Sequence, residues 1–210
     1  MNGSKVGVEA PRGGVRAHPF IAAFTVAYVV GFGIFSLARG IAAFWVYTAV
    51  ITVLMSIVAV VDRRICLGPR LLTALSVWGL AHMAGGLIPV ETADGHVLYN
   101  VVLIPHLLRY DQLVHAFGFG TAAAVCRRVL EIRAPGMLPG TLTVCVWLMG
   151  MGLGAFNEVA EFATTLVQPQ SNVGGYRNTA FDLVFNMLGS GVVALWAGRR
   201  AAMGSHAAPG

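Results

Sequence analysis

Six apolar segments, most of them long enough to cross a bilayer, follow one another along the chain and limit what it can fold into. A membrane-spanning helix needs about 20 predominantly apolar residues. The segments cover residues 19–38, 41–61, 71–90, 111–126, 137–167 and 179–197. Charged residues make up only 11% of the 210 residues, about half the share found in soluble domains. The sequence therefore predicts an all-α fold, a polytopic transmembrane helical bundle of about six spans.

The predicted bundle, residues 19–197, lies between a polar and basic tail at 1–18 and a short tail at 198–210, both expected to be disordered. Ser36-Leu37-Ala38 imitates a signal-peptidase site, but the length of the first segment favours an uncleaved span. With the N-terminus inside, eleven of the 14 Lys and Arg residues lie on the cytoplasmic side. This bias predicts that both termini are cytoplasmic, in a multi-pass protein of the bacterial cytoplasmic (inner) membrane.

The net charge of +5 comes from basic residues at the segment ends, so topology explains it and we expect no nucleic-acid partner. The three cysteines show neither a disulfide framework nor a zinc signature, and we interpret them as packing residues. They are Cys66, Cys126 and Cys145. Residues 96–108 are apolar but too short to span, and Pro105 excludes a helix there. We expect this loop to lie on or dip into the outer membrane surface, as an interfacial loop or, alternatively, a functional lid.

Two carboxylates lie inside the fifth apolar segment, where an ionisable group is costly to keep. On a helix, Glu158 and Glu161 lie about 60° apart, and Asn157 sits almost directly below Glu161. Neither helix capping nor water can account for carboxylates at this depth. These two residues are therefore the strongest candidates for function.

Ionisable groups on the neighbouring spans fall at the same level, in the outer half of the membrane. Asp111 opens the fourth span with His115 one turn later, and Asp182 and Asn186 repeat this spacing on the sixth. Asp111 could instead be a helix N-cap, and His82 on the third span a buried histidine bonded to a backbone carbonyl. We interpret the other histidines as surface or interfacial residues: His18, His96, His106 and His206.

Four carboxylates would meet at this level, and they cannot all ionise in a low-dielectric interior without compensation. Compensation could come from protonation, from Arg109 or Arg177, or from a bound metal. Histidine nitrogens beside carboxylate oxygens suit a divalent metal such as Zn, Mn or Fe, and helical bundles build dinuclear sites from such residues. The predicted metal ligands are His115, Glu158, Glu161 and Asp182.

Three functions fit this pattern. The first is a metal-dependent membrane enzyme, a hydrolase or phosphoryl transferase, acting on a lipid or lipid-linked substrate from the outer leaflet. The second is a proton- or cation-coupled transporter. The third is a structural or partner-binding membrane protein whose polar cluster locks its helices together. The enzyme hypothesis gives catalysis to Glu158, Glu161, Asp111 and His82, with support from Asn157, Asn186, Arg109 and Arg177.

Three motifs follow in order on the last spans: Tyr110-Asp111-x-x-x-His115-x-x-Gly118, Asn157-Glu158-x-x-Glu161 and Asn178-Thr179-x-x-Asp182-x-x-x-Asn186-x-x-Gly189. The set resembles the YjdF-like bacterial inner-membrane proteins, a family of uncharacterised function, and more distantly the VanZ-like proteins. The resemblance covers residues 71–197 and implies a shared polar core. The family has Tyr-Glu where this chain has Asn157-Glu158, and Asp-Thr where it has Asn178-Thr179. The second departure removes a candidate acidic ligand.

Overall fold

The computed structural model describes residues 17–41, 43–93, 95–167 and 175–206. The predicted basic tail at 1–18 lies outside these ranges except for its last two residues. Within the described ranges, six α-helices build the bundle, and they are α1 (Pro19–Arg39), α2 (Phe44–Ile65), α3 (Pro69–Leu87), α4 (Tyr110–Arg133), α5 (Pro139–Val167) and α6 (Tyr176–His206). Between α3 and α4 come β1 (Pro89–Thr92), β2 (Gly95–Val97), the 3-10 helix η2 (Leu98–Asn100), β3 (Val102–Ile104) and β4 (Leu108–Arg109).

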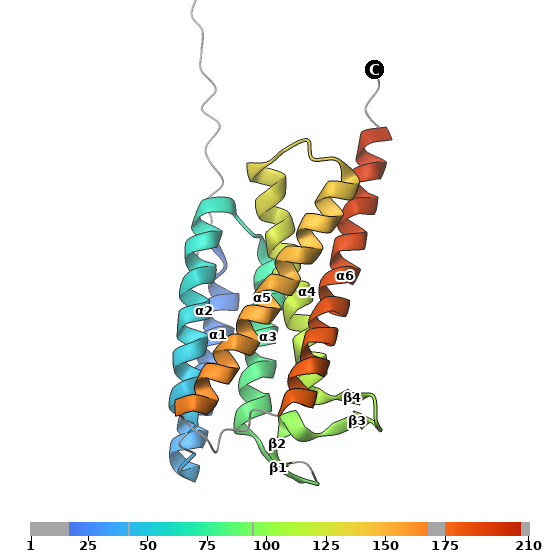
Figure 1. Cartoon of the computed structure of the whole chain (residues 1–210). Coiled ribbons are helices and arrows are strands. Elements are labelled where there is room, and N and C mark those ends of the chain that lie inside the picture. The colour runs from blue at the N-terminus through green and yellow to red at the C-terminus, as the bar shows by residue number, and fades with distance from the viewer. Residues whose placement is uncertain (1–16, 42, 94, 168–174, 207–210) are drawn as a thin grey trace, which may run out of the picture.

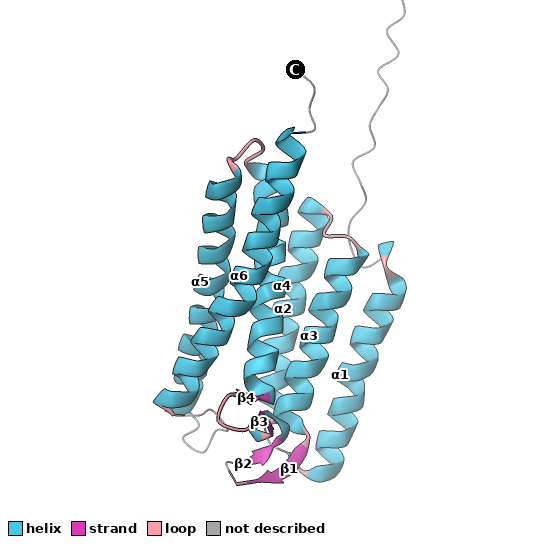
Figure 2. Ribbon diagram, turned by 90° about the vertical axis from the view of Figure 1, so that its right-hand side faces the viewer, coloured by secondary structure: helices cyan, strands magenta, loops and turns pink. Residues whose placement is uncertain are grey.

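The helices alternate in direction, so that α1 begins and α6 ends at the same end of the bundle (Figure 1). We call this the terminal end. The strands lie at the opposite end in both views, and we call it the hairpin end (Figures 1 and 2). The helices α4, α5 and α6 pack most extensively on one another, and α3 packs against α1 and α4. The predicted all-α helical bundle is confirmed, while its orientation in the membrane stays a prediction.

Among the described helices, five are long and apolar enough to cross a membrane, and α3 is the exception. Its residues Arg70 and His82 lower its mean hydropathy most. A helix enclosed by other helices need not present an apolar surface to lipid, and α3 lies in the middle of the bundle (Figure 1). The predicted set of about six spans therefore corresponds to six helices, five of which have the composition of a span.

The last helix is longer than the sequence predicts. The apolar segment ends near residue 197, and a disordered tail was expected beyond it, but α6 continues to His206. Around this point the Trp196 ring contacts two guanidinium groups, with Arg127 of α4 at 4.4 Å and Arg200 of α6 at 4.8 Å from its centroid. The cation–π contact with Arg127 holds the polar end of α6 against α4. Hydropathy marks where the apolar surface ends, not where the helix ends.

The apolar loop at 96–108 contributes to two small antiparallel hairpins, in which β1 pairs with β2 and β3 pairs with β4. Pro105 lies in the turn between β3 and β4, where no ladder hydrogen bond is needed. The side chains of Val102, Ile104 and Leu107 are exposed on this second hairpin. The strands are local additions to a helical protein, and the contact of this loop with the membrane surface stays a prediction.

Glycines allow α4, α5 and α6 to approach closely at the level of the polar residues. A Cβ atom on Gly189 of α6 would overlap the backbone carbonyl oxygen of Ala116 on α4. A Cβ atom on Gly154 of α5 would lie 2.7 Å from Nδ2 of Asn186 on α6. Small residues of this kind are the usual means by which membrane helices come into contact. The backbone packing therefore places the polar side chains of three helices within reach of one another.

We expect Gly189→Ala to lower the thermal stability of the detergent-purified protein. The added methyl group would meet backbone, which cannot move aside without separating α4 from α6. Overpacking of this kind costs about 1–3 kcal/mol. Gly152→Ala on α5 is the matched control, because nothing lies within 4 Å of a Cβ there and alanine favours the helix. Equal melting temperatures for the two variants would contradict the described contact.

Candidate functional site

His115 of α4 lies buried at the centre of a group of polar side chains from three helices. Its Nδ1 is 3.1 Å from Oδ1 of Asn186 on α6 and 3.4 Å from Oε1 of Glu158 on α5. Its Nε2 is 3.5 Å from Oδ1 of Asp111 on α4 and 3.8 Å from Oε1 of Glu161 on α5. Oxygen atoms from α4, α5 and α6 thus surround one imidazole ring.

Asn178, in the first turn of α6, links two of the carboxylates. Its Nδ2 donates hydrogen bonds to Oδ2 of Asp111 at 3.0 Å and to Oδ2 of Asp182 at 2.5 Å. Sequence reasoning assigned no role to Asn178. The available signal was its spacing, because it precedes Asp182 by four residues and so shares its face of the helix. The two aspartates, His115, the two glutamates, Asn178 and Asn186 form what we call the polar cluster.

Buried polar atoms of both kinds in the polar cluster lack a hydrogen-bond partner among the residues that the structure describes. They are the acceptors Oε1 and Oε2 of Glu158 and Oδ1 of Asp182, and the donor Nδ2 of Asn186. Donation from Nδ1 of His115 to Asn186 leaves Nε2 as the side of the ring with the lone pair. The lone pair of Nε2 therefore faces an oxygen of Asp111, which is also an acceptor, and the two groups repel each other. A second proton on the ring, or a cation bound between the two atoms, would remove this repulsion.

The atoms of the polar cluster are close enough to share a metal ion. In each of two groups, Asp111–His115–Asp182 and His115–Glu158–Glu161, one ligand atom per residue lies within 4.8 Å of the others. Ligand atoms about 2.0–2.2 Å from a zinc ion are about 3–4 Å apart, so small side-chain movements would complete a site. The structure therefore brings together all four residues predicted as metal ligands, and adds Asp111 to them.

The residues predicted to support the site occupy two different places. Asn157 lies at the edge of the polar cluster and donates from Nδ2 to Oε1 of Glu161 at 2.7 Å. Asn186 lies inside the cluster and is almost fully buried. Arg109 and Arg177 instead line a cavity at the hairpin end. The amide pair thus contacts the cluster directly, whereas the arginine pair lines the cavity, from which the charge of Arg109 still acts on Asp182.

Asp111 is not the N-cap of its helix, which is the alternative that the sequence left open. The N-cap of α4 is Arg109, and Asp111 lies in the first turn. The backbone N–H of Arg109 donates to Oε1 of Gln112, which completes the helix start. The carboxylate of Asp111 therefore does not cap the helix and takes part in the polar cluster.

His82 lies beside a tyrosine, outside both groups of ligand atoms found among the described residues. The hydroxyl oxygen of Tyr99, on η2, is 2.5 Å from Nδ1 and 3.0 Å from the backbone oxygen of His82. Burial raises the pKa of Tyr99 well above its usual range, so its phenol stays a neutral donor. The Tyr47 ring packs on the same imidazole, with the centroids 5.2 Å apart. This arrangement favours the interpretation of His82 as a buried, hydrogen-bonded histidine.

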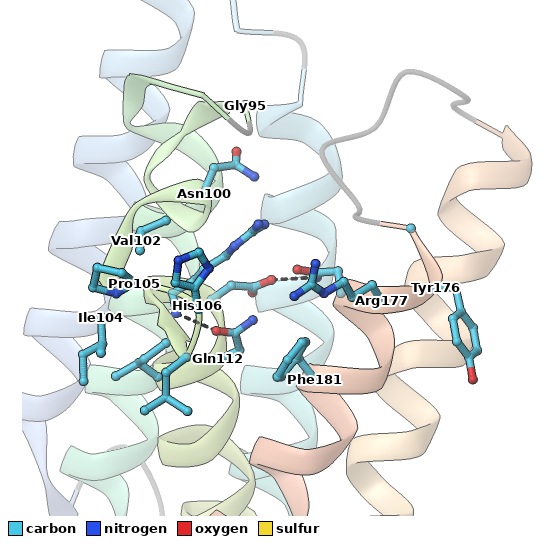
Figure 3. Close-up of a pocket in the computed structure, with 16 residues that line it drawn as sticks. Gly95, Asn100, Val102, Ile104, Pro105, His106, Gln112, Tyr176, Arg177 and Phe181 are labelled. Atoms are coloured by element: carbon cyan, nitrogen blue, oxygen red, sulfur yellow. Dashed lines mark hydrogen bonds between the residues drawn. The ribbon is translucent and has the colours of Figure 1, made fainter.

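A cavity of about 960 Å³ lies at the hairpin end, next to the polar cluster. Figure 3 shows the residues that line it. The β3–β4 hairpin, the start of α4 and the start of α6 form its walls. Asp111 and Asn178 belong both to the cavity lining and to the polar cluster. A small molecule that enters this cavity would therefore meet the cluster at Asp111.

A family profile described as "Predicted membrane protein (DUF2238)" matches residues 20–202. The chain belongs to this family. A search of the curated proteins and a search of the solved structures each found no match. The family and the five apolar helices together establish a multi-pass membrane protein with a buried acidic and histidine cluster. The narrower likeness to YjdF-like and VanZ-like proteins, and the location in a bacterial inner membrane, stay predictions.

We expect Asn178→Ala to destabilise the protein, because the change removes the donor that Asp111 and Asp182 share. Leaving a buried partner unpaired costs about 1–3 kcal/mol. Thermal unfolding in detergent measures the loss, and Thr179→Ala, at the next position of the same turn, serves as the control. If both variants melt with the wild type, Asn178 does not link the two carboxylates.

Proposed function

We propose that this protein is an integral-membrane, metal-dependent enzyme that acts on a lipid or lipid-linked substrate from the hairpin end. One observation carries the proposal: carboxylates from three helices converge on a buried His115 and leave buried oxygens without donors, beside a cavity that opens away from the bundle. Buried acceptors without partners need an explanation, and a divalent cation supplies one. A cation would also offset the charge of the four acids.

The ligand set suits a first-row divalent metal. One histidine nitrogen among several carboxylate oxygens fits Zn, Mn or Fe. The hydrogen bond from Nδ1 of His115 to Asn186 orients the ring in the manner usual for metal-bound histidines, with Nε2 as the ligand atom. When bound, such a metal would activate a water molecule or polarise a phosphoryl oxygen. Hydrolysis or phosphoryl transfer is the chemistry that follows.

The residues of this chain would bind the metal, transfer a proton and position one another. Glu158 and Asp182, both buried, would hold the metal. Asp111 is the acid of the cluster that also lines the cavity, so it is best placed to take a proton from a water molecule there. Asn157 would position Glu161 through its hydrogen bond. His82 would keep α3 and η2 together by way of Tyr99 rather than act on the substrate.

A second cavity supports a lipid as substrate. It measures about 270 Å³, and aliphatic side chains of α1, α2 and α3 make up most of its lining. The lining also includes His82 and Asn157, and Asn157 contacts the polar cluster through Glu161. Apolar space next to a polar site is what a substrate with an acyl or isoprenoid chain requires.

Two alternatives from the sequence have less support. Many transporters bind their substrate near the midplane, where helices are interrupted, but the polar cluster lies toward the hairpin end, where α4 and α6 begin. A purely structural cluster would be expected to satisfy its buried oxygens, and Glu158 and Asp182 do not. Both alternatives are outcomes of the experiment below.

We expect the purified protein to retain at least about one divalent metal ion per chain, measured by inductively coupled plasma mass spectrometry. Glu158→Gln combined with Glu161→Gln should lose the metal. Glu131→Gln is the matched control, because Glu131 is also on a membrane helix but pairs with Arg127, away from the cluster. In the wild type, adding the metal at about 100 times its dissociation constant should raise stability by about 2.7 kcal/mol, and this gain should vanish in the double variant.

A wild-type protein that neither retains a metal nor gains stability from one would contradict the proposal. In that case pH-dependent ion flux into liposomes, abolished in the double variant, would support transport. A double variant that only loses thermal stability, with no flux in either protein, would support the structural alternative.

A further inference from the structure

We infer that the cavity at the hairpin end binds the phosphate headgroup of an anionic membrane lipid. The inference rests on the proposed function, because the acidic polar cluster at the base of the cavity would repel a phosphate group unless a divalent cation neutralised it. It names the substrate class on which that site would act.

Basic side chains from separate elements gather around this cavity. His106 comes from the β3–β4 turn, Arg109 from the end of β4, and Arg177 from the first turn of α6. Figure 3 shows Arg177 and Phe181 on one wall, facing the hairpin that carries His106. Arginine is the side chain best suited to bidentate hydrogen bonds with phosphate oxygens. The lining therefore presents donors to an anion from two opposite walls.

The backbone at the starts of α4 and α6 also attracts a phosphate group. Both α4 and α6 begin at this cavity, and their first residues are part of its lining. A helix N-terminus carries unpaired N–H groups and about half a unit of positive charge, which favours phosphate groups. Two long helices that start at one cavity, together with Arg109 and Arg177, create a positive entrance to a cavity whose lining reaches the acidic polar cluster at Asp111. This is the charge pattern expected where a metal and basic side chains hold one phosphate between them.

The rim of the cavity points to a lipid as the source of that phosphate. Val102, Ile104 and Leu107 line the cavity and are 46%, 46% and 58% exposed. Figure 3 shows Val102, Ile104 and Pro105 together on one side of the cavity, across from Arg177. An apolar edge beside basic groups suits a molecule with an apolar chain and a charged head, at the level where membrane and water meet. A cavity of about 960 Å³ has room for such a headgroup.

Ligand-dependent stabilisation of the detergent-purified protein tests this inference. The probes are a short-chain phosphatidic acid, the phosphatidylcholine of the same chain length, and inorganic phosphate. We expect phosphatidic acid to raise the melting temperature in a saturable way, phosphatidylcholine to have a much weaker effect, and inorganic phosphate to have little effect at the same concentration.

Arg177→Gln should weaken the apparent affinity for phosphatidic acid about tenfold or more, the effect of losing a charge-assisted hydrogen bond. Arg39→Gln is the matched control. Like Arg177, Arg39 is exposed at the hairpin end and stacks on a phenylalanine ring of its own helix. The guanidinium carbon is 5.8 Å from the ring centroid of Phe35 for Arg39 and 5.7 Å from that of Phe181 for Arg177. Unlike Arg177, Arg39 does not line the cavity. Without ligand both variants should melt close to the wild type, because exposed arginines contribute little to stability.

Three results would overturn the inference: equal stabilisation by both lipids, equal loss of affinity in both variants, or inorganic phosphate acting as strongly as the lipid, which would indicate a site for a soluble anion.

Metal content measured on the same samples separates this inference from the proposed function. A metal-loaded protein without lipid preference refutes only the headgroup site. A lipid preference that depends on Arg177 in a metal-free protein refutes the metal-dependent enzyme and shows that the headgroup binds without the cation.

Discussion

The structure depends on how four carboxylates are accommodated inside a membrane bundle. An acidic residue costs up to about 3 kcal/mol when it lies at the centre of a spanning helix, and less toward the helix ends. Four acids toward one end of the bundle therefore carry a cost that is large compared with the marginal stability of a folded protein. The bundle reduces this cost by turning Asp111, Glu158, Glu161 and Asp182 toward one imidazole and away from lipid. Once the four acids meet around His115, they need a proton or a cation, and that requirement connects the fold to a function.

Backbone packing makes this meeting possible. Close approaches between α4, α5 and α6 occur at Gly154 and Gly189, within one or two helical turns of the polar cluster. On the hairpin side, the starts of α4 and α6 open into a cavity with basic walls. The acidic polar cluster therefore lies next to a cavity with basic walls. An anionic substrate would be attracted by the walls but repelled by the cluster unless a cation were bound there. A bound metal would therefore make both groups of charges favourable for an anionic substrate.

The sequence alone allowed prediction of the helical bundle and most of the polar cluster, because helical spacing places residues on known faces. The four-residue step from Asp111 to His115 and the matching step on α6 were sufficient to bring these groups to one level. Hydropathy and spacing carry no information on partners that come from irregular segments. For that reason the contact of Tyr99 with His82 could not be predicted. The spacing of Asn178 and Asp182 on α6 did indicate a shared helix face, but not that Asn178 would also donate to Asp111 on α4. The hairpins were likewise not predicted, since a short apolar loop has no helical period.

The proposed divalent cation would bind where α4, α5 and α6 converge on His115. Anomalous diffraction from crystals grown with Zn²⁺ or Mn²⁺, recorded on both sides of the metal absorption edge, would locate it. We expect an anomalous peak about 2.0–2.3 Å from Nε2 of His115 and from carboxylate oxygens of at least two of the four acids. An ordered polar cluster with no peak inside it, or with the metal bound only at surface histidines, would show that the cluster is not a metal site.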